Sequence, residues 1–501
     1  MKELPFRIST LPYGKSRCAE EALTAHAGEG RPAVPGPQKN AARAIPESGS
    51  AGQQREKTLK NTYGHTLALG FMLFALFFGA GNLIFPAAMG QSAGSSVWWA
   101  ILGFCVTGVG LPLLAVAAIG YSGCRDLQEA AGRVHPWYGL AYSVICYLSI
   151  GPCFAIPRTG TVSYEIAVKP FLGDAAPEWA MPLFLLGFFA VSLWFAISPS
   201  KLVDRIGKVL TPALLAVIAV LVVKSVMTPM GEPGAASDAY ATPLVAVVQG
   251  VLDGYNTLDA IAAVIFASLV VNIIKESGVT DTSEIAKTVY KAGAAAVAAL
   301  AVVYIFIAKI GAESVAAIGM QDTGAPVLAK SAMVLFGNAG AGLLSVIVLL
   351  ACVSTAIGLI TCCAAYFMER FGHFSYRTYA VAFTVISYLI ALFGLKTIIV
   401  ATVPVLMFIY PLVVALIALL FLNNFFGGRQ CVYAWTMGCT LIMAFINLFE
   451  TAGVQLGALE EFLKAYVPLH TYGLGWLGFA VVGFVIGLVW KAACPAKVAA
   501  S

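Results

Sequence analysis

Long apolar runs constrain this chain more than any other feature of its sequence. Each has roughly 18–25 residues, the length that an α-helix needs to cross about 30 Å of hydrocarbon. We count about twelve runs, near residues 66–89, 97–120, 137–156, 181–197, 207–228, 244–273, 289–311, 331–366, 378–395, 398–422, 431–449 and 472–490. The eighth is long enough to be tilted or to include an amphipathic entry helix, so about eleven or thirteen spans also fit.

The composition supports the same class. The chain is 59% hydrophobic and only 11% charged, and its mean hydropathy of +0.85 is far above that of a soluble globular protein. We therefore predict an all-α polytopic membrane protein. The net charge of +5 then reflects the topology of the loops, and no nucleic-acid partner is expected.

The first run is interrupted. Gly79, Gly81, Asn82 and Pro86 lie in its middle and far end. Each glycine costs about 1 kcal/mol of helix stability relative to alanine, and unpaired backbone groups in lipid cost several kcal/mol more. Such a break survives only where protein or a bound solute satisfies the freed N–H and C=O groups, so it predicts a binding site at membrane depth.

The sixth run has a second interruption at residues 250–259, where a glycine and two carboxylates separate two apolar halves. The two broken runs are five apart, as expected of a five-helix repeat copied in inverted orientation. In that arrangement half-helix N-termini face an anionic group and half-helix C-termini offer carbonyls to a cation. A zwitterionic solute fits both ends.

Two aspartates belong to this second interruption. An ionisable side chain near the bilayer midplane costs at least about 2.5 kcal/mol, so Asp253 or Asp259 is expected to line a polar cavity, although either could be solvated at the membrane face. Asn256 and Thr257 either line the same cavity or cap a half-helix.

The eighth run contains adjacent hydroxyls at Ser354 and Thr355. Such residues in membrane helices most often bond their own helix backbone. Together with the carbonyl of Ala351, one turn upstream, they could instead supply three oxygen ligands to a small cation.

Two enzyme-like matches carry little weight. The segment 90–94 fits the GxSxG nucleophile pattern, but that chemistry needs a strand-turn-helix setting and a histidine base. The histidines lie in the N-terminal segment or near the ends of runs: His26, His65, His135, His373 and His470. The segment 473–478 fits GxGxxG but opens the last apolar helix, and with Gly483 and Gly487 it predicts a helix-packing face. The chain is therefore not expected to be an enzyme.

The eleven cysteines are irregularly spaced and include no CxxC pair. Most fall inside predicted spans, where cysteine is usually a small packing residue. We expect neither a disulfide framework nor a structural metal site, and no cofactor.

The basic residues between the runs predict the orientation. With a cytoplasmic N-terminus, the cytoplasmic loops carry eleven of them: Arg125, Arg133, Lys201, Arg205, Lys208, Lys275, Lys287, Lys291, Arg370, Arg377 and Arg429. The opposite loops carry seven: Arg158, Lys169, Lys224, Lys309, Lys330, Lys396 and Lys464. Both termini are therefore expected in the cytoplasm.

Residues 1–61 are rich in Gly, Pro, Ala and charge, without a signal-peptide core. They cannot bury enough apolar surface to fold alone, so we expect a disordered cytoplasmic tail; a misplaced translation start is the alternative. The expected organisation is a tail at 1–61, a transporter domain at 62–492 with repeats at 65–229 and 243–422 and two last helices at 430–491, and a short cytoplasmic tail at 493–501.

The residues around the breaks resemble a known family. The stretch from His65 to about Gly123, centred on residues 68–86, is similar to the opening of the bacterial branched-chain amino acid transport system II carriers of the BrnQ type. Segments 254–260 and 354–356 also resemble that family, so the resemblance covers roughly residues 62–492.

The resemblance implies a symporter of leucine, isoleucine and valine in the bacterial plasma membrane, with alternating access and the fold of the sodium-coupled leucine transporters. Carried over to this chain, it implies a sodium site made of the carbonyls of Ala75, Phe78 and Ala351 and the hydroxyls of Ser354 and Thr355. Oxygen ligands suit Na⁺, but Asp253 or Asp259 could carry a proton, so coupling to H⁺ stays open.

The resemblance also implies that the substrate carboxylate meets the N–H groups near Ala80 and Gly81, and that its ammonium meets carbonyls near Phe77 and around residues 255–257. The expected substrate-binding residues are Phe77, Phe78, Gly79, Ala80, Gly81, Asn82, Tyr255, Asn256, Thr257 and Asp259. Phe78, Tyr255 and Phe266 either form walls of the apolar pocket or pack between helices. Such a pocket would separate substrates that differ by one methylene by only about 1–3 kcal/mol.

Two other functions fit part of the pattern. A cation-coupled carrier of another small amphipathic solute would use the same broken helices. A channel would also need pore-lining polar residues, but it would show neither saturation nor counterflow.

Overall fold

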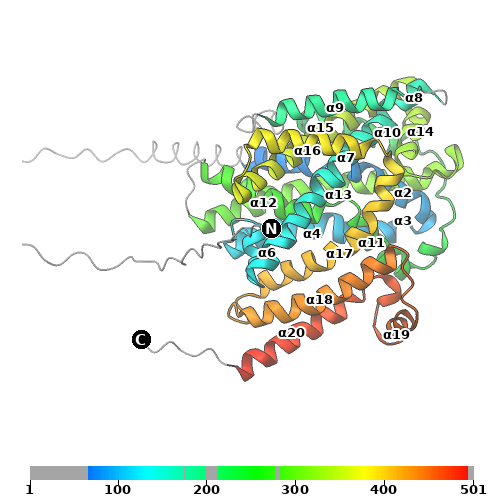
Figure 1. Ribbon diagram of the computed structural model, residues 1–501. Coiled ribbons are helices and arrows are strands. Elements are labelled where there is room, and N and C mark those ends of the chain that lie inside the picture. Colours follow the sequence, from blue (N-terminus) through cyan, green and yellow to red (C-terminus); the bar gives the residue numbers. More distant parts are fainter. Residues whose placement is uncertain (1–65, 174–176, 198–210, 277–280, 495–501) are drawn as a thin grey trace, which may run out of the picture. The chain divides into compact units, whose positions relative to one another are not determined.

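The computed structural model describes residues 66–173, 177–197, 211–276 and 281–494. All regular secondary structure in these ranges is helical (Figure 1). A helix over Thr66–Phe77 is followed by α2 (Ala80–Ala93), α3 (Val97–Cys105), α4 (Leu111–Ser122), α5 (Leu127–Gly132), α6 (Pro136–Leu148), α7 (Ala155–Ala167), α8 (Lys169–Leu172), α9 (Ala180–Ala196), α10 (Thr211–Met227), α11 (Pro243–Tyr255), α12 (Asp259–Glu276), α13 (Thr282–Ile318), α14 (Gly324–Phe336), α15 (Asn338–Phe371), α16 (Tyr376–Ala391), α17 (Leu395–Leu422), α18 (Gln430–Thr451), α19 (Ala458–Tyr466) and α20 (Trp476–Ala493).

Several residues for which the sequence makes a prediction lie outside the described ranges. The proposed tail at 1–61 lies outside the described residues, as do His26, His65 and the basic residues Lys201, Arg205 and Lys208. The end of the chain beyond residue 494 lies outside them too.

The described helices confirm a multi-span membrane protein. Seven helical stretches within the described ranges are long and apolar enough to cross a membrane, or eight if the bent pair α11 and α12 forms one span. Four further apolar helices are shorter: Thr66–Phe77, Ala180–Ala196, Thr211–Met227 and Gly324–Phe336. The larger number of about twelve spans stays a prediction.

The first predicted break exists and is narrower than expected. The helix stops after Phe77, and α2 begins at Ala80, so only two residues are unwound. Asn82 caps the new helix, because its side-chain oxygen accepts a 3.1 Å hydrogen bond from the Gly79 N–H. Pro86 lies inside α2 and does not interrupt it, contrary to the prediction.

The second predicted break also exists. α11 ends at Tyr255 and α12 begins at Asp259, with a bend of 44° between them. Leu258 has a φ of 68°, which is uncommon for a residue with a side chain. The residues from 250 to 255 are helical, so the interruption is again shorter than the polar segment predicted.

The third run continues beyond its predicted end. A short segment over Ser149–Cys153, which contains Pro152 and is kinked at Gly151, leads from α6 into α7. Arg158 therefore lies inside a helix and not in a loop, and Lys309 likewise lies within α13. The predicted loop at Arg158 was wrong, because a charged residue ends an apolar run in the sequence. In the structure the Arg158 side chain faces protein and not lipid, so the helix continues through it.

The eighth run is divided. α14 ends at Phe336 and α15 begins at Asn338, with Gly337 between them at a φ of 63°. The expected entry helix thus corresponds to α14, which is separate from the long helix that carries the hydroxyl pair.

Helix pairs approach closely where glycines face a neighbouring backbone. A Cβ at Gly90 in α2 would collide with the Ala308 carbonyl of α13, and one at Gly311 would collide with the Ala87 carbonyl in return. Gly90 belongs to the GxSxG match, so its role here is helix packing.

The outermost helices have apolar surfaces. α18 and α20 run side by side, with α20 (red) outermost in Figure 1. Their contact uses the predicted glycine face, since a Cβ at Gly483 would lie 2.6 Å from the Trp435 carbonyl oxygen.

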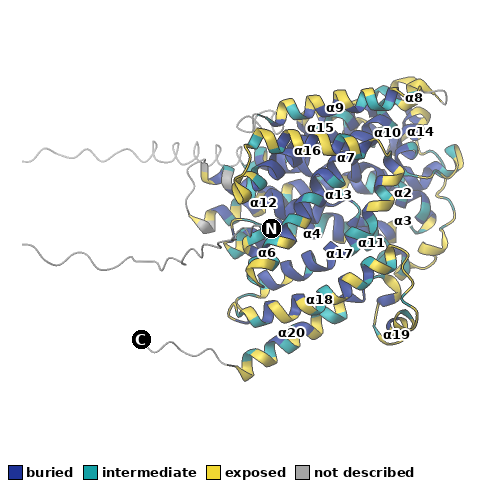
Figure 2. Cartoon of the chain, in the orientation of Figure 1, coloured by how far each residue is buried: buried dark blue, intermediate teal, exposed yellow. Residues whose placement is uncertain are grey.

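Figure 2 shows buried residues concentrated in the interior of the helix assembly and exposed residues along outer helices such as α9 and α20. Many exposed residues there are large and apolar, including Trp194 and Val489, as expected of a lipid-facing surface.

Candidate functional site

The two breaks meet at one small cavity. Residues from the first break, the second break, the third predicted span and α15 surround it: Leu76, Phe77, Gly79, Ala80, Gly81, Asn82, Ile150, Ala155, Arg158, Thr159, Thr257, Leu258, Asp259, Ala262, Phe266, Thr355 and Leu359. The volume open to the centres of water molecules is about 20 Å³. That space holds about one or two waters, so a larger solute requires the walls to move apart.

Arg158 supplies the positive charge of this cavity. It lies on α7, and only 3% of its surface is exposed. Its Nη1 donates to the Asn256 carbonyl at 2.9 Å and its Nη2 to the Thr257 carbonyl at 3.4 Å. The guanidinium also lies 5.1 Å from the centre of the Phe85 ring. Arg158 therefore links α7 to carbonyls that the second break releases from helical hydrogen bonding.

Asp259 supplies the negative charge, at the N-terminus of α12. Its Oδ2 accepts a 2.6 Å hydrogen bond from Asn82 Nδ2 and another of 2.6 Å from the Tyr304 hydroxyl. Asn82 and Tyr304 also contact each other. Because Asn82 caps α2, this cluster joins the two broken helices directly.

The hydroxyl pair of α15 contacts the end of the first half-helix. Ser354 Oγ donates to the carbonyls of Ala75 at 3.0 Å and Ala351 at 2.9 Å. Thr355 Oγ1 donates to the carbonyls of Leu76 at 3.2 Å and Ala75 at 3.4 Å. Four of the five expected sodium ligands therefore lie together. The fifth expected ligand is the backbone carbonyl of Phe78. The side chain of this residue points to Phe74, with the two rings stacked and their centroids 5.2 Å apart.

Seven of the ten expected substrate-binding residues line the cavity: Phe77, Gly79, Ala80, Gly81, Asn82, Thr257 and Asp259. Phe78, Tyr255 and Asn256 do not line it. The Tyr255 ring stacks instead on Tyr410, with centroids 4.1 Å apart, and Asn256 offers its carbonyl to Arg158. Of the three aromatic walls expected, Phe266 alone lines the cavity.

The alternatives left open at the second break have separate outcomes. Asp259 lines the cavity, whereas Asp253 accepts hydrogen bonds from Tyr240 at 2.5 Å and Gln249 at 3.1 Å away from it. Thr257 both lines the cavity and caps α12, because its hydroxyl accepts a 3.3 Å hydrogen bond from the Asp259 N–H.

Sequence reasoning missed two residues of this cluster. The sequence predicts a loop at Arg158, because a charge at the end of an apolar run has the same local pattern whether it lies in a loop or inside a longer helix. Tyr304 gave no local signal, since one tyrosine in an apolar run usually packs in the core.

A second, larger cavity also borders α12 and α15. It offers about 190 Å³ to water centres and is lined by Arg125, Asp126, Tyr147, Ile265, Ser268, Leu269, Lys275, Thr361, Cys362, Ala365, Tyr366 and Glu369. Its residues on α12 and α15 follow those of the first cavity along each helix, from Phe266 to Leu269 and from Leu359 to Cys362. The second cavity, with the loop of Arg125 and Asp126, therefore lies beyond the first in the C-terminal direction of α12 and α15.

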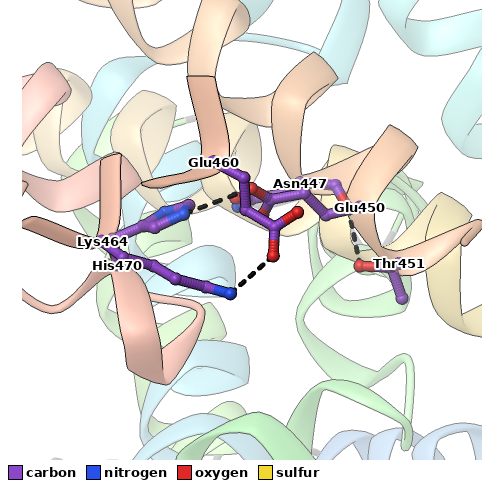
Figure 3. Close-up of polar contacts among 6 residues, drawn as sticks. All are labelled: Asn447, Glu450, Thr451, Glu460, Lys464 and His470. Atoms are coloured by element: carbon purple, nitrogen blue, oxygen red, sulfur yellow. Dashed lines mark hydrogen bonds and ion pairs between the residues drawn. The ribbon is translucent and has the colours of Figure 1, made fainter. Parts of the chain in front are cut away.

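The enzyme-like matches have no catalytic setting. The segment 90–94 ends α2 and begins the next helical turn, with no strand before it. Among the histidines that the structure describes, His470 is the buried one; it lies far along the chain from Ser92 and has its Nε2 3.2 Å from Glu450 Oε1 (Figure 3). In the same region Lys464 lies 2.5 Å from Glu460, and the hydrogen bond and charge of this ammonium lower the pKa of the half-buried Glu460 carboxyl.

Solved structures share this fold. The chain aligns with Mhp1, a nucleobase-cation-symport-1 family transporter in a closed conformation with bromovinylhydantoin bound, at a TM-score of 0.56 and 16% identity, over 86% of this chain and 93% of that one. It aligns with MhsT in complex with L-phenylalanine at a TM-score of 0.53 and 18% identity, over 84% and 98%. The expected leucine-transporter-like fold is thereby confirmed.

Curated relatives are much closer in sequence. The branched-chain amino acid permease BraB of Bacillus subtilis is 45% identical over 85% of this chain and 95% of that protein. The branched-chain amino acid permease BrnQ of Escherichia coli K12 is 34% identical over 87% and 97%. The family model described as branched-chain amino acid transport protein matches residues 62–494. The chain therefore belongs to the branched-chain amino acid transport protein family, and it is a multi-pass membrane transporter and not an enzyme.

Proposed function

We propose that this chain is a secondary symporter that imports leucine, isoleucine and valine across a bacterial plasma membrane, driven by Na⁺ or H⁺. The observation that carries the proposal is the meeting of the two helix breaks around one buried cavity with a cationic and an anionic side chain. A zwitterionic amino acid presents both charges in a small volume. The names of the permeases to which the chain is similar support branched-chain amino acids as the substrates.

The proposed pose uses the ends of the half-helices. The substrate carboxylate lies near the N–H groups of Ala80 and Gly81, where free amides and the helix dipole favour an anion. The ammonium lies near the carbonyls of Phe77 and of the second break. The aliphatic side chain then packs against Ala262, Phe266 and other apolar residues of the cavity wall.

The cavity dimensions support alternating access. The space around the charged residues is too small for leucine, so binding requires helices to separate. The larger cavity on α12 and α15 is the proposed release path, toward the loop that contains Arg125. Rocking of one helical bundle against the other would open and close these routes.

The proposed sodium ligands are the carbonyls of Ala75, Phe78 and Ala351 and the hydroxyls of Ser354 and Thr355. Four of these groups already lie within 3.4 Å of a neighbour in the set, which supports a shared ion. Sodium would pin the first half-helix against α15 and so favour the substrate site. Asp259 is the proposed proton carrier if the driving ion is H⁺.

We further propose about twelve spans, with inverted repeats at 65–229 and 243–422 within a transporter domain at 62–492, and both termini in the cytoplasm. The two broken helices support the repeat. Because Arg158 and Lys309 lie inside helices, the non-cytoplasmic loops carry five of the seven basic residues first counted there. The excess of basic residues in the cytoplasmic loops is therefore larger than predicted, which supports the proposed orientation.

Uptake of radiolabelled leucine into proteoliposomes tests the proposal. We expect an inward Na⁺ gradient to stimulate uptake that saturates, shows counterflow and is inhibited by isoleucine and valine. Leucine uptake that is stimulated by an inward proton gradient in the absence of Na⁺ would identify H⁺ as the coupling ion. Uptake that responds to neither gradient, or that never saturates, would contradict a symporter.

A further inference from the structure

We propose that Arg158 binds the carboxylate of the transported amino acid directly and thereby excludes substrates that lack one. This inference rests on the proposed function, because it concerns how the same cavity selects its substrate. It adds a side-chain ligand to a carboxylate site that would otherwise consist of backbone amides alone.

The hydrogen bonding of Arg158 is incomplete. A guanidinium has five N–H donors and no acceptor. Arg158 uses two nitrogens on backbone carbonyls, one of them at 3.4 Å, and its buried Nε–H has no partner among the described residues. Nε and Nη2 share one edge of the guanidinium, and this is the edge with which arginine holds a carboxylate through two parallel hydrogen bonds.

That edge lies beside the N-terminus of α2. A Cβ at Gly81 would come 2.7 Å from Nη2 of Arg158, so the absence of a side chain at Gly81 leaves room for the guanidinium. The first residues of α2, from Ala80 to Asn82, line the same cavity, and they form the positive end of the helix dipole. Two positive features that converge in a buried space repel each other, and an anion between them would remove this cost.

The carboxylate of Asp259 does not already fill this role. It is held by Asn82 and Tyr304, and among the described residues no carboxylate lies within 4.0 Å of the Arg158 guanidinium. Arg158 therefore makes no direct ion pair, although Asp259 acts on it electrostatically across the same cavity, and a buried charge without a contacting counter-ion is costly. The substrate is the carboxylate that completes it.

The test compares leucine with leucinamide, which has the same side chain and ammonium but no carboxylate. Binding to the purified full chain is measured at about pH 6.5, where both α-amino groups are protonated. We expect the wild type to prefer leucine by at least roughly 100-fold, Arg158→Gln to lose leucine affinity by roughly 30-fold or more, and its preference to fall below about tenfold. Arg158→Lys, which keeps the charge without the fork, should retain an intermediate preference.

Arg133→Gln is the matched control. Arg133 is also partly buried and donates to Asn423, Tyr433 and the Ser122 carbonyl, but it lines neither cavity. We expect its preference for leucine to equal that of the wild type. An Arg158→Gln protein that loses leucine and leucinamide affinity equally would overturn the proposal, because Arg158 would then only brace the second break.

Two further results separate the hypotheses. A wild type that binds no leucine overturns the proposed function itself. If the Arg158 variants do not fold, Gly81→Ala is the second variant, because its Cβ would lie 2.7 Å from Nη2 of Arg158 and would displace the guanidinium. A preference for leucine over leucinamide that falls below about tenfold in this variant supports direct carboxylate binding, and a preference equal to that of the wild type overturns it.

Discussion

Asn82 and Asp259 are 177 residues apart in the sequence, yet the Asn82 side-chain amide donates a 2.6 Å hydrogen bond to the Asp259 carboxylate. This bond joins the N-termini of two half-helices, one from each broken span. Each half-helix needs protein partners for its freed backbone groups, because the bilayer supplies none. The contact therefore links the two breaks directly.

Asp259→Asn should impair transport strongly. The substitution preserves size but removes the buried charge that Asn82 and Tyr304 stabilise, so we expect gradient-driven leucine uptake to fall at least about tenfold. The matched control is Asp253→Asn, since Asp253 belongs to the same break region but lies outside the cavity. Equal uptake by the two variants would show that the cavity carboxylate has no special role.

Ser354→Ala should weaken sodium activation. Loss of one oxygen ligand is expected to raise the Na⁺ concentration for half-maximal leucine uptake about tenfold, which corresponds to about 1.4 kcal/mol. Ser345→Ala is the control, because Ser345 is a buried serine on the same helix whose hydroxyl bonds its own backbone at Ala341. An unchanged sodium dependence in Ser354→Ala would argue against this ion site.

Gly90→Ala should destabilise the protein. The new methyl group would meet the Ala308 carbonyl of α13, and overpacking of this kind costs about 1–3 kcal/mol. We expect a lower Tm for thermal unfolding in detergent. Gly187→Ala in α9 is the control, since a Cβ there meets nothing within 4 Å and alanine favours a helix. A Tm that falls as far in the control would indicate an effect unrelated to α2 packing.

Cys362 and Cys363 should differ in reactivity with a water-soluble thiol reagent. Cys362 lines the larger cavity, whereas Cys363 is fully buried and its sulfur contacts the Tyr147 carbonyl. In chains that retain only one of these two cysteines, we expect labelling of Cys362 to be at least about tenfold faster. Faster labelling of Cys363 would mean that water does not reach α15 through this cavity.

The helix breaks were predictable because their causes are local. Glycines, Asn82 and the polar segment before Asp259 disfavour an unbroken membrane helix whatever surrounds them. The extent of each break was not predictable: Pro86 and Gly254 remain helical, since only Phe78, Gly79 and residues 256–258 leave the helix. A polar cluster shows where a helix is weak, but packing decides which residues unwind.

The site was predictable in the same uneven way. Asn82, Thr257 and Asp259 line the cavity as expected, because buried polar groups in lipid need a common polar environment. Phe78 and Tyr255 do not line it, since each ring stacks on another aromatic residue. The direction of an aromatic side chain depends on neighbours far away in the sequence, so local pattern does not determine it.

The sequence by itself determined that this chain crosses the membrane many times, where two of its helices are weakened and which family it resembles. Those properties follow from the hydrophobicity and backbone preferences of consecutive residues. Only the tertiary structure decided that Arg158 and Tyr304 join the site, through contacts that span 98 and 45 residues of the chain. A buried charge is tolerated only where distant groups complete its hydrogen bonds, and only the folded chain brings those groups together.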